Sequence, residues 1–469
     1  MSDSEHLALL GRRTMASDDR PNLSIVRLLC LTSFMMATGL VLSTYGMITL
    51  ALESYRLTPD YANLTLSALL ALAGVSQLVC PLAGYVSDRA GTRVPFIAGG
   101  AGGLALGLAA QWAVRGLDGP GAALLYGAAF FGSMLSLNVA YTAATSLVPD
   151  LVPERQTGAA NGLAVFLQVL GSCGGFMYYF VVDDLARLYA LYVGSVVVFA
   201  SITLAAAADA SPLRSSPRGE RNPLKGGAVL PPAPAREPWS WADIAKCYYV
   251  SPADPAARDF FFVWISRTLY YTGGSVQAFL VYFVRDRLDD DGPTRIDRFL
   301  APYVSTADPA RATCAIALAG YAAGVVAAVP AGMLSDWTGR KPMVVVACCL
   351  MSASMVGLGF ATTASQVIIM GLIGGLGNGC YQAVDLALAV DTIPDLEESA
   401  RYLGIWGVGA FVGVCLGPVI GAPLLYVFGQ IEAPPPPANG QLGYIALFAY
   451  GSLAMFLSAA VLIHKVRVR

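Results

Sequence analysis

A carboxylate stands deep inside an apolar stretch near the end of the chain, within GNGCYQAVDLALAVDTIPD at residues 377–395. Asp391 and Asp395 are explained by a helix end, because Pro394 and the charged segment LEESAR follow them. Asp385 precedes that proline by nine residues, so on a helix that rises ~1.5 Å per residue it lies roughly 12 to 14 Å further in. A carboxylate at this depth needs a partner or a function.

Arg267 is a second charge in an apolar segment, about 12 Å along the helix axis from the start of that segment near Asp259. A single charge at the centre of a membrane helix costs about 2.5 to 3.5 kcal/mol to insert. Opposite charges at matched depth therefore predict an ion pair between Arg267 and Asp385. Three roles stay open for it: a structural clamp, part of a binding site for a polar solute, or a coupling switch in which a proton on Asp385 releases Arg267.

Polar side chains surround both charges at helical spacing. Positions i, i+3, i+4 and i+7 form one stripe about 100° wide on a helix, and this spacing occurs on three segments. Either these groups line a cavity for a solute or they only hold helices together. The cavity candidates are Asn138, Tyr141, Thr142, Thr145, Arg267, Tyr270, Tyr271, Gln277, Asn378, Tyr381, Gln382 and Asp385.

The composition indicates that these segments lie in a lipid bilayer. The 469 residues are 56% hydrophobic and only 13% charged, with a mean hydropathy of +0.60, whereas a soluble protein is about 25% charged. Apolar runs long enough to cross ~30 Å of hydrocarbon as a helix begin near residues 25, 62, 94, 122, 156, 186, 259, 312, 342, 365, 400 and 441. The sequence predicts an all-α integral membrane protein of twelve transmembrane helices, whose partners are the bilayer and a small solute rather than nucleic acid.

Basic residues in short loops predict the orientation. The side that holds both termini receives most of them, including Arg89, Arg93, Arg340 and Lys341, so both termini are expected in the cytoplasm. Near the N-terminus, EHLALL places Glu5 before Leu9 and Leu10, a pattern of acidic dileucine signals that bind sorting adaptors, although so short a string also arises by chance. The expected location is the plasma membrane or an endolysosomal or vacuolar membrane.

The chain divides into two similar halves. We expect a cytoplasmic tail at 1–24, a six-helix bundle at 25–208, a cytoplasmic linker rich in proline, glycine and charge at 209–258, a second six-helix bundle at 259–465 and a tail at 466–469. GYVSDRAGTR at 84–93 returns as GMLSDWTGRK at 332–341, an offset of 248. An internal duplication of this kind places a binding site between the halves, at the membrane midplane.

The repeated loop resembles the signature of the major facilitator superfamily, and the resemblance covers nearly the whole chain outside the tails and the linker. It implies two pseudo-symmetric six-helix bundles, alternating access, and a cavity lined by spans one, four, seven and ten. It also implies a cytoplasmic gate, in which the charged residues of the two loops hold the bundles together as a latch in the outward-open state. The alternative is that these charges only determine the orientation of the helices in the membrane. The residues that carry the two copies are Gly84, Asp88, Arg89, Gly91 and Arg93, then Gly332, Asp336, Gly339, Arg340 and Lys341.

Departures from the family pattern narrow the expected function. Span four has no charge and span five lacks the glycine-proline motif of drug-proton antiporters, which favours a uniporter or proton symporter. The stripes favour a sugar-like or glycoside-like solute, with an organic anion or amino acid as the alternative and a non-transporting scaffold or sensor as the rival class. The two histidines lie at the termini and no phosphate-binding loop is present, so neither an enzyme nor a metal site is predicted. A monomer is expected, with a proton as the one candidate coupling ion and no other cofactor.

Overall fold

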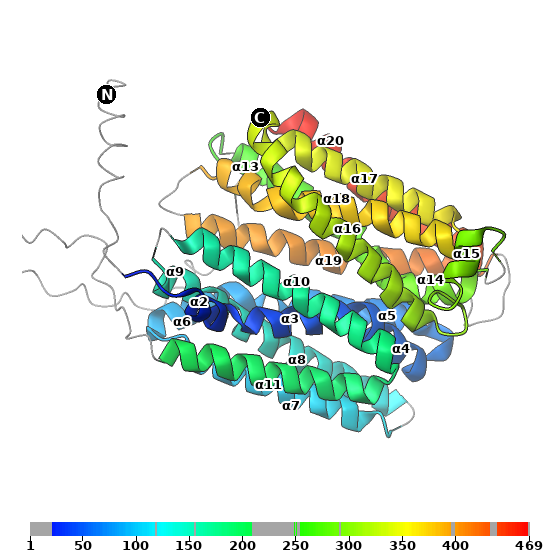
Figure 1. The fold of residues 1–469 in the computed structure, drawn as a ribbon, viewed down its shortest axis with the longest axis horizontal. Helices are drawn as coiled ribbons and strands as arrows, with labels where there is room; N and C mark the ends of the chain where they lie inside the picture. The colour runs from blue at the N-terminus through cyan, green and yellow to red at the C-terminus, as the bar shows by residue number, and fades with distance from the viewer. Residues whose placement is uncertain are drawn as a thin grey trace, which may run out of the picture.

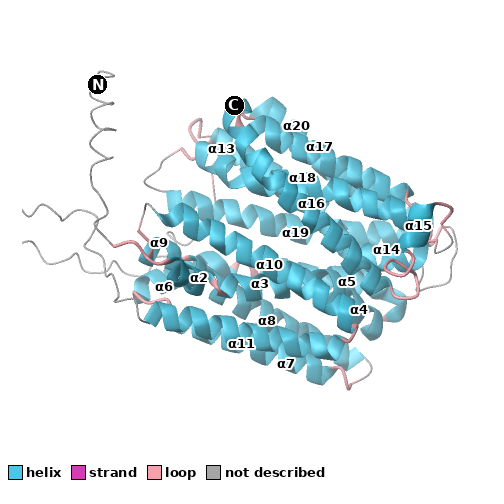
Figure 2. Ribbon diagram, in the orientation of Figure 1, coloured by secondary structure: helices cyan, strands magenta, loops and turns pink. Residues whose placement is uncertain are grey.

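The computed structural model describes residues 21–117, 120–153, 156–208, 248, 250, 254–289, 292–394, 399–431 and 439–467. In these parts the chain consists of helices joined by short loops (Figures 1 and 2). Each predicted span begins within three residues of an observed helical segment. The sorting-signal residues Glu5, Leu9 and Leu10 and nearly all of the predicted linker lie outside the described residues.

The first six spans run from residue 25 to residue 208. They are α2, α3, the π-helical turn η1 and α4 (Ile25–Thr32, Phe34–Thr44, Tyr45–Thr49, Leu50–Leu57), η2, α5 and α6 (Pro59–Tyr61, Ala62–Ser76, Val79–Ala90), α7 (Val94–Val114), α8 and α9 (Pro120–Thr145, Leu147–Leu151), α10 (Thr157–Val182) and α11 (Leu185–Ala208).

The second six spans run from residue 258 to residue 465. They are α13, η4 and α14 (Arg258–Ser275, Val276–Phe279, Leu280–Arg287), α16 (Pro309–Thr338), α17 (Arg340–Phe360), α18 (Ala364–Asp391), α19 (Ser399–Gly429) and α20 (Gln441–Lys465), with the short α15 (Arg295–Leu300) between the first two.

Among the described residues, eleven helical segments are long and apolar enough to cross a membrane. The segment at residues 258–287, predicted as span seven, does not meet this criterion. It is interrupted by η4 and carries six charged residues, three of them within α13. Its α13 nevertheless packs against α19 and α20, inside the second half of the chain. This segment therefore completes twelve spans by its packing rather than by its apolarity.

The two halves use the same helix neighbours. In the first, α3 packs on α10, α7 on α8, and α7 on α11; in the second, α13 packs on α19, α17 on α18, and α17 on α20. These are the same pairs, counted by span within each half. Figure 1 shows the two bundles side by side, the first below and the second above. The sequence repeat is thus a structural repeat.

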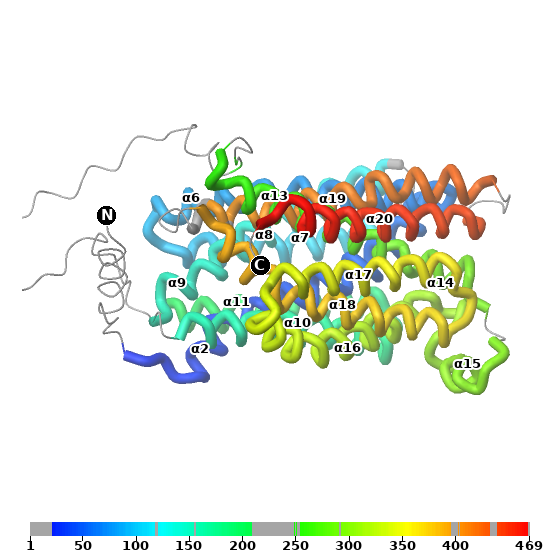
Figure 3. Tube along the Cα trace, turned by 90° about the horizontal axis from the view of Figure 1, so that it is seen from above, coloured from blue at the N-terminus to red at the C-terminus, as the bar shows by residue number. Residues whose placement is uncertain are grey.

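The bundles meet most firmly at one end. We call the end at which α2 begins and α20 ends the terminal face, and the opposite end, with α14 and α15, the far face (Figures 1 and 3). Among the described residues, the main helix pairs between the bundles are α5 with α19 and α10 with α16, and η1 also contacts η4, α14 and α16. In the half of the membrane toward the far face, hydrogen bonds of 2.8 to 3.1 Å join Asn63 to Asn439, Ser67 to Pro418, Tyr282 to Ala51 and Ser43 to Tyr321. The structure is a conformation closed at the far face.

The short helix α15 is fastened to the start of α18 by Asp297. This buried carboxylate accepts hydrogen bonds from the backbone N–H of Ser365 at 2.8 Å and from the N–H and hydroxyl of Thr294 at 3.1 and 2.6 Å. The hydrogen bonds from Ser365 and Thr294 hold the pKa of Asp297 well below its ordinary value. The carboxylate therefore stabilises the fold above the unfolded-state pKa of about 3.9, and this contribution is lost as the pH falls through the lower folded-state pKa.

We expect Asp297→Ala to lower the stability of the protein by on the order of 1 kcal/mol, because the capping bonds of α15 and the bond to α18 are lost. Thermal unfolding of the purified protein in detergent measures this change. The deficit should be the same at pH 7 and pH 5, since Asp297 stays ionised at both. Asp60→Ala, at an exposed acid of the short helix η2, is the control; equal melting temperatures of the two variants would contradict the prediction.

Candidate functional site

Arg267 on α13 and Asp385 on α18 form the ion pair that the sequence predicts. Their side chains are only 8% and 5% exposed, and they come from neighbouring helices of the second bundle. Two charges removed from water in this way are tolerable only as a pair, because either one alone would carry an uncompensated desolvation cost. The ion pair thus explains why Arg267 and Asp385 both lie within apolar segments.

Aromatic rings enclose the guanidinium of Arg267. Its central carbon lies 3.3 Å from the ring centre of Trp406 on α19 and 4.7 Å from that of Tyr271 on α13. Such contacts attract a cation electrostatically, more strongly where water is excluded. Trp406 is absent from the sequence-based candidates because LGIWGVG contains no polar neighbour. Arg267 itself could have indicated that an aromatic residue such as Trp406 lies nearby, since a buried guanidinium needs aromatic faces as well as a carboxylate.

The polar stripes of α13 and α18 face each other, and most of their side chains bind or stack on one another. The rings of Tyr270 and Tyr381 stack with centres 3.4 Å apart and planes within 4°. The hydroxyl of Tyr270 donates to the side-chain oxygen of Asn378 at 3.1 Å. In this conformation these three residues serve helix packing, the alternative that the sequence left open. Gln382 differs, because it is exposed and its amide reaches the Tyr271 hydroxyl at 3.4 Å.

The stripe of span four is mostly engaged within its own bundle. The amide of Asn138 donates to the Ser76 hydroxyl at 2.9 Å, and the Thr145 hydroxyl bonds back to carbonyls of its own helix at 3.0 Å. The methyl group of Thr142 faces Gly84 of α6. Tyr141 instead lies close enough to Tyr271 and Arg267 in the other bundle to interact electrostatically with both.

One residue of the predicted set, Gln277, lies apart from the Arg267–Asp385 pair. Gln277 lies on η4, ten residues beyond Arg267 and therefore about 15 Å away along the helix axis. The structure thus gathers part of the predicted set, together with one residue that the sequence did not indicate. The residues of this cluster, which we call the arginine site, are Tyr141, Arg267, Tyr271, Gln382, Asp385 and Trp406.

Two buried donors of the arginine site have no acceptor among the described residues. They are the Nε–H of Arg267 and the indole N–H of Trp406. Buried N–H groups are nearly always hydrogen-bonded in folded proteins, and leaving one unpaired costs about 1–3 kcal/mol. Each of these donors is therefore open to an acceptor group from outside the described residues. The net charge of the ion pair is near zero, so the bound group can be an anion balanced by a cation or a strong neutral acceptor.

The repeated loops at the terminal face each turn at a glycine, although the two turns have different shapes. Gly91 and Gly339 both adopt a positive φ, of 66° and 95°, which explains why each loop requires glycine. Arg93 pairs with Asp88 and, at 2.8 Å, with Asp150, all in the first bundle. In the second bundle Arg340 pairs with Asp336 at 2.5 Å and approaches Asp391 at 3.8 Å.

Each of these arginine clusters therefore closes within its own bundle in this conformation. The remaining basic residues of the loops are also engaged: Arg89 contacts Tyr85, and Lys341 donates to the Val466 carbonyl at the end of α20 at 2.8 Å. Gly84 and Gly332 lie on the helices that lead into the loops. The predicted latch between bundles belongs to the opposite conformation and stays a prediction.

A second buried carboxylate, Glu53, lies in the first bundle and is missing from the sequence-based candidates. Its side chain is fully buried and pairs with Arg56 at 2.8 Å and Arg115 at 2.7 Å. A hydroxyl chain from Tyr45 through Tyr126 to Tyr189 lies nearby, with O–O distances of 2.8 and 2.9 Å. The i, i+3 spacing of Glu53 and Arg56 is the signal that could have indicated it. With both oxygens facing arginines, Glu53 is a structural anchor between spans one and three.

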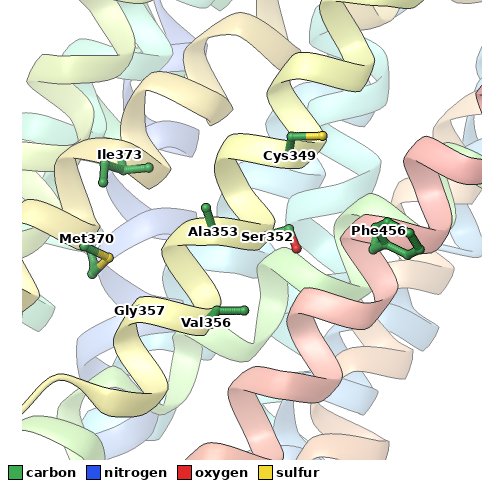
Figure 4. Close-up of a pocket in the computed structure, with 8 residues that line it drawn as sticks. All are labelled: Cys349, Ser352, Ala353, Val356, Gly357, Met370, Ile373 and Phe456. Atoms are coloured by element: carbon green, nitrogen blue, oxygen red, sulfur yellow. The ribbon is translucent and has the colours of Figure 1, made fainter.

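A groove of about 540 Å³ lies on the outside of the second bundle, between α17, α18 and α20. Figure 4 shows its apolar lining, which includes Val356, Met370 and Phe456. Val356 and Phe456 are strongly exposed, as expected of side chains that face lipid tails. The groove is separate from the arginine site and is not a candidate for a polar solute.

The family model described as Major Facilitator Superfamily matches residues 10–176 and 263–468. The chain belongs to the major facilitator superfamily. This superfamily member is therefore a multi-pass membrane transporter and not an enzyme. The family match confirms the membership that the two loop copies indicated. It also confirms the predicted twelve-helix fold.

Sequence relatives share only short stretches with this superfamily member. Citrate exporter 1 of Yarrowia lipolytica is 32% identical over 103 residues, which cover 22% of this chain and 15% of the exporter. Multidrug resistance protein MdtL of Escherichia coli O139:H28 is 30% identical over 140 residues, 29% of this chain and 36% of MdtL. The chain thus matches well under two thirds of the length of either relative.

Solved structures match this superfamily member over nearly its full length. The nucleoside transporter NupG covers 94% of the chain, which in turn covers 99% of NupG, with a TM-score of 0.59 and 11% identity. A POT family transporter in complex with 5-aminolevulinic acid gives 93% and 94% coverage, a TM-score of 0.63 and 12% identity. At these identities the likeness shows a common fold.

Proposed function

We propose that this transporter carries a small solute with a hydrogen-bond acceptor group, an organic anion or a zwitterion, which binds at the arginine site. The observation that carries this proposal is the pair of buried N–H donors, on Arg267 and Trp406, that lack an acceptor among the described residues. A carboxylate is the strongest acceptor that a small metabolite commonly offers to such donors. Asp385 and the Gln382 amide stand close to Arg267 and Tyr271, so polar groups elsewhere on the solute also find partners.

The sugar-like solute favoured by the polar stripes becomes the second choice. Three of the side chains that would contact its hydroxyl groups, Tyr270, Asn378 and Tyr381, are engaged with one another. An acceptor-bearing solute needs none of them. A sequence relative that bears the name citrate exporter lends this choice some further support, although the match covers 22% of the chain.

The proposed mechanism is alternating access of the arginine site. With both termini in the cytoplasm, the conformation closed at the far face is inward-facing, and the solute reaches Gln382 and Tyr271 from the cytoplasmic side. The Arg93 and Arg340 clusters then exchange their partners within each bundle for partners across the bundles when the cytoplasmic side closes. Through this exchange the loops would act as the latch.

A binding panel on the purified protein tests the solute class. Sugars, amino acids and carboxylates are compared by thermal shift and then by counterflow into proteoliposomes. We expect the carboxylates or amino acids to raise the melting temperature and to exchange across the membrane. Stabilisation and flux with sugars alone would refute the anion or zwitterion proposal, and absence of flux with every compound would favour the scaffold or sensor class.

Trp406→Phe separates the indole N–H from the stacking role of this side chain. The ring face under Arg267 is kept, so the fold should remain, but one donor to the solute is lost. A hydrogen bond to a charged group such as a carboxylate is worth about 1.5–3 kcal/mol, so the solute Kd should rise roughly 10- to 150-fold. Titration of the best compound from the panel measures this change. Trp264→Phe is the control, because the Trp264 indole donates to the Ile405 carbonyl at 2.9 Å; an unchanged Kd in Trp406→Phe would contradict the role.

A further inference from the structure

The far-face closure contains a contact between two carboxyl groups, one from each bundle. Asp183 follows α10 in the first bundle and Asp308 precedes α16 in the second, and their carboxyl groups make a hydrogen-bonding contact. The same two helices also meet through Phe180, which lies 6.3 Å from the Tyr303 ring and 4.9 Å from the Arg311 guanidinium. The acid pair therefore lies on the interface that must separate when the far face opens.

Both carboxyl groups belong to residues at helix ends. Asp183 ends α10 in the left-handed conformation, with a φ of 47°. Asp308 caps the first turn of α16, where its carboxylate accepts the Arg311 backbone N–H at 3.0 Å. The Asp308 carboxylate therefore cannot leave its position without disturbing the start of α16.

The charged and titratable surroundings of the pair come from three helices. Tyr179 on α10 and Arg311 on α16 face Asp183, and Cys314 on α16 lies near Tyr179. At the start of α11, Asp184 is already paired with Arg187 at 3.3 Å within the first bundle.

Partial burial and the Asp308 carboxyl raise the pKa of Asp183 above its ordinary value, and the Tyr179 hydroxyl and the Arg311 guanidinium offset only part of this rise. Two carboxylates in contact repel each other, whereas one shared proton turns the repulsion into a hydrogen bond. The favourable contact thus requires one proton. When the bundles separate at the far face, each carboxylate regains water and this requirement ends.

We propose that Asp183 and Asp308 form a pH-sensitive switch in the far-face gate: a shared proton holds the two bundles together, and loss of that proton lets them part. Because the protonated form is favoured in the closed state, closure is stabilised at low pH and is lost as the pH rises through the raised pKa of Asp183. An acidic far compartment therefore drives the transporter toward the conformation described here. The switch rests on the alternating access proposed above and makes no use of the solute.

Distance measurements between two spin labels test the switch. Cysteines introduced by Val181→Cys and Ala307→Cys lie at exposed positions beside Asp183 and Asp308, one in each bundle, in a background without the nine native cysteines. Pulsed electron resonance of the labelled protein in nanodiscs, without solute, records the near and far populations between pH 4.5 and pH 8. Each unit by which the pKa differs between the closed and open states changes their ratio up to tenfold, so we expect the near population to fall as the pH rises.

Three variants identify the groups that respond. Asp183→Asn and Asp308→Asn mimic the protonated form, and asparagine both tolerates the left-handed conformation and caps a helix. Each should keep the gate in the near population at all pH values. Asp184→Asn is the matched control and should keep the pH dependence of the parent. A ratio that does not change with pH in the parent, or a change that persists in both Asp183→Asn and Asp308→Asn, would overturn the switch and leave the solute proposal untouched.

Discussion

Asp385→Asn is expected to nearly abolish transport and to destabilise the protein. The substitution leaves the Arg267 guanidinium, 8% exposed, without its carboxylate. Breaking a buried ion pair by removing one partner costs about 3–5 kcal/mol, which at tenfold per 1.4 kcal/mol lowers the population of correctly formed sites by roughly 100- to 4,000-fold. Counterflow in proteoliposomes and thermal unfolding in detergent measure the two effects.

The double variant Arg267→Gln with Asp385→Asn separates stability from transport. With both charges gone, no uncompensated charge remains, so the melting temperature should return close to that of the parent. Transport should stay low, because the Nε–H donor to the solute is gone as well. Glu53→Gln is a matched control, since it breaks a buried carboxylate pair in the other bundle and should reduce stability while leaving flux per folded molecule nearly unchanged.

Two outcomes assign a different role to the pair. Restored transport in the double variant would make it a structural clamp between α13 and α18. Solute exchange that persists in Asp385→Asn while accumulation is lost would make Asp385 the coupling carboxylate. Accumulation that is unchanged in Asp385→Asn would exclude coupling through this residue.

Gly379→Leu is expected to prevent the second bundle from folding. Helices α16 and α18 cross so closely that a Cβ at Gly379 would overlap the backbone of Gly324, and one at Gly375 would overlap that of Gly320. Small residues allow this approach in membranes, where helix association depends on packing. Overpacking a core typically costs 1–3 kcal/mol, and the cost is expected to exceed this range here because the obstacle is backbone that cannot rotate away.

Size-exclusion chromatography of a fluorescent fusion measures the folded fraction. Gly127→Leu on α8 is the control, because a Cβ there meets no atom within 4 Å. We expect a single symmetric peak for Gly127→Leu and aggregated or absent protein for Gly379→Leu. Equal peaks would show that α16 and α18 do not need this close approach.

The span positions were predictable because the length of an apolar run is itself the physical requirement for crossing a bilayer. The starts of α10, α18 and α20 agree with the sequence within one residue. The Arg267–Asp385 pair was predictable for a related reason, since matched depth on two helices of one bundle leaves few other partners. Two copies of one loop at the repeat offset likewise predicted a glycine turn in each half, and Gly91 and Gly339 both adopt a positive φ, although their ψ angles of 21° and 158° differ.

Partner choice within the bundle was not predictable from periodicity. Spacing shows which side chains share a face, but not whether that face meets a cavity or another helix. Tyr270 and Tyr381 therefore looked like solute contacts, whereas they stack on each other. Trp406 was missed for a different reason, because it belongs to no polar stripe and its partner Arg267 lies on a helix far away in sequence. Glu53 also belongs to no polar stripe, and one of its two partners, Arg115, lies at the end of another helix.

The interrupted, charge-bearing span seven has a consequence for biosynthesis. Its α13 packs on α19 and α20, and its arginine pairs with α18, all of which are made later. Asp385 follows Arg267 by 118 residues (385 − 267), so at about 5–20 residues per second the arginine waits roughly 6 to 24 s for its carboxylate. During that interval the segment has little apolarity of its own to keep it in lipid. The second bundle is therefore completed as one late event, once the last three helices have left the ribosome, rather than helix by helix.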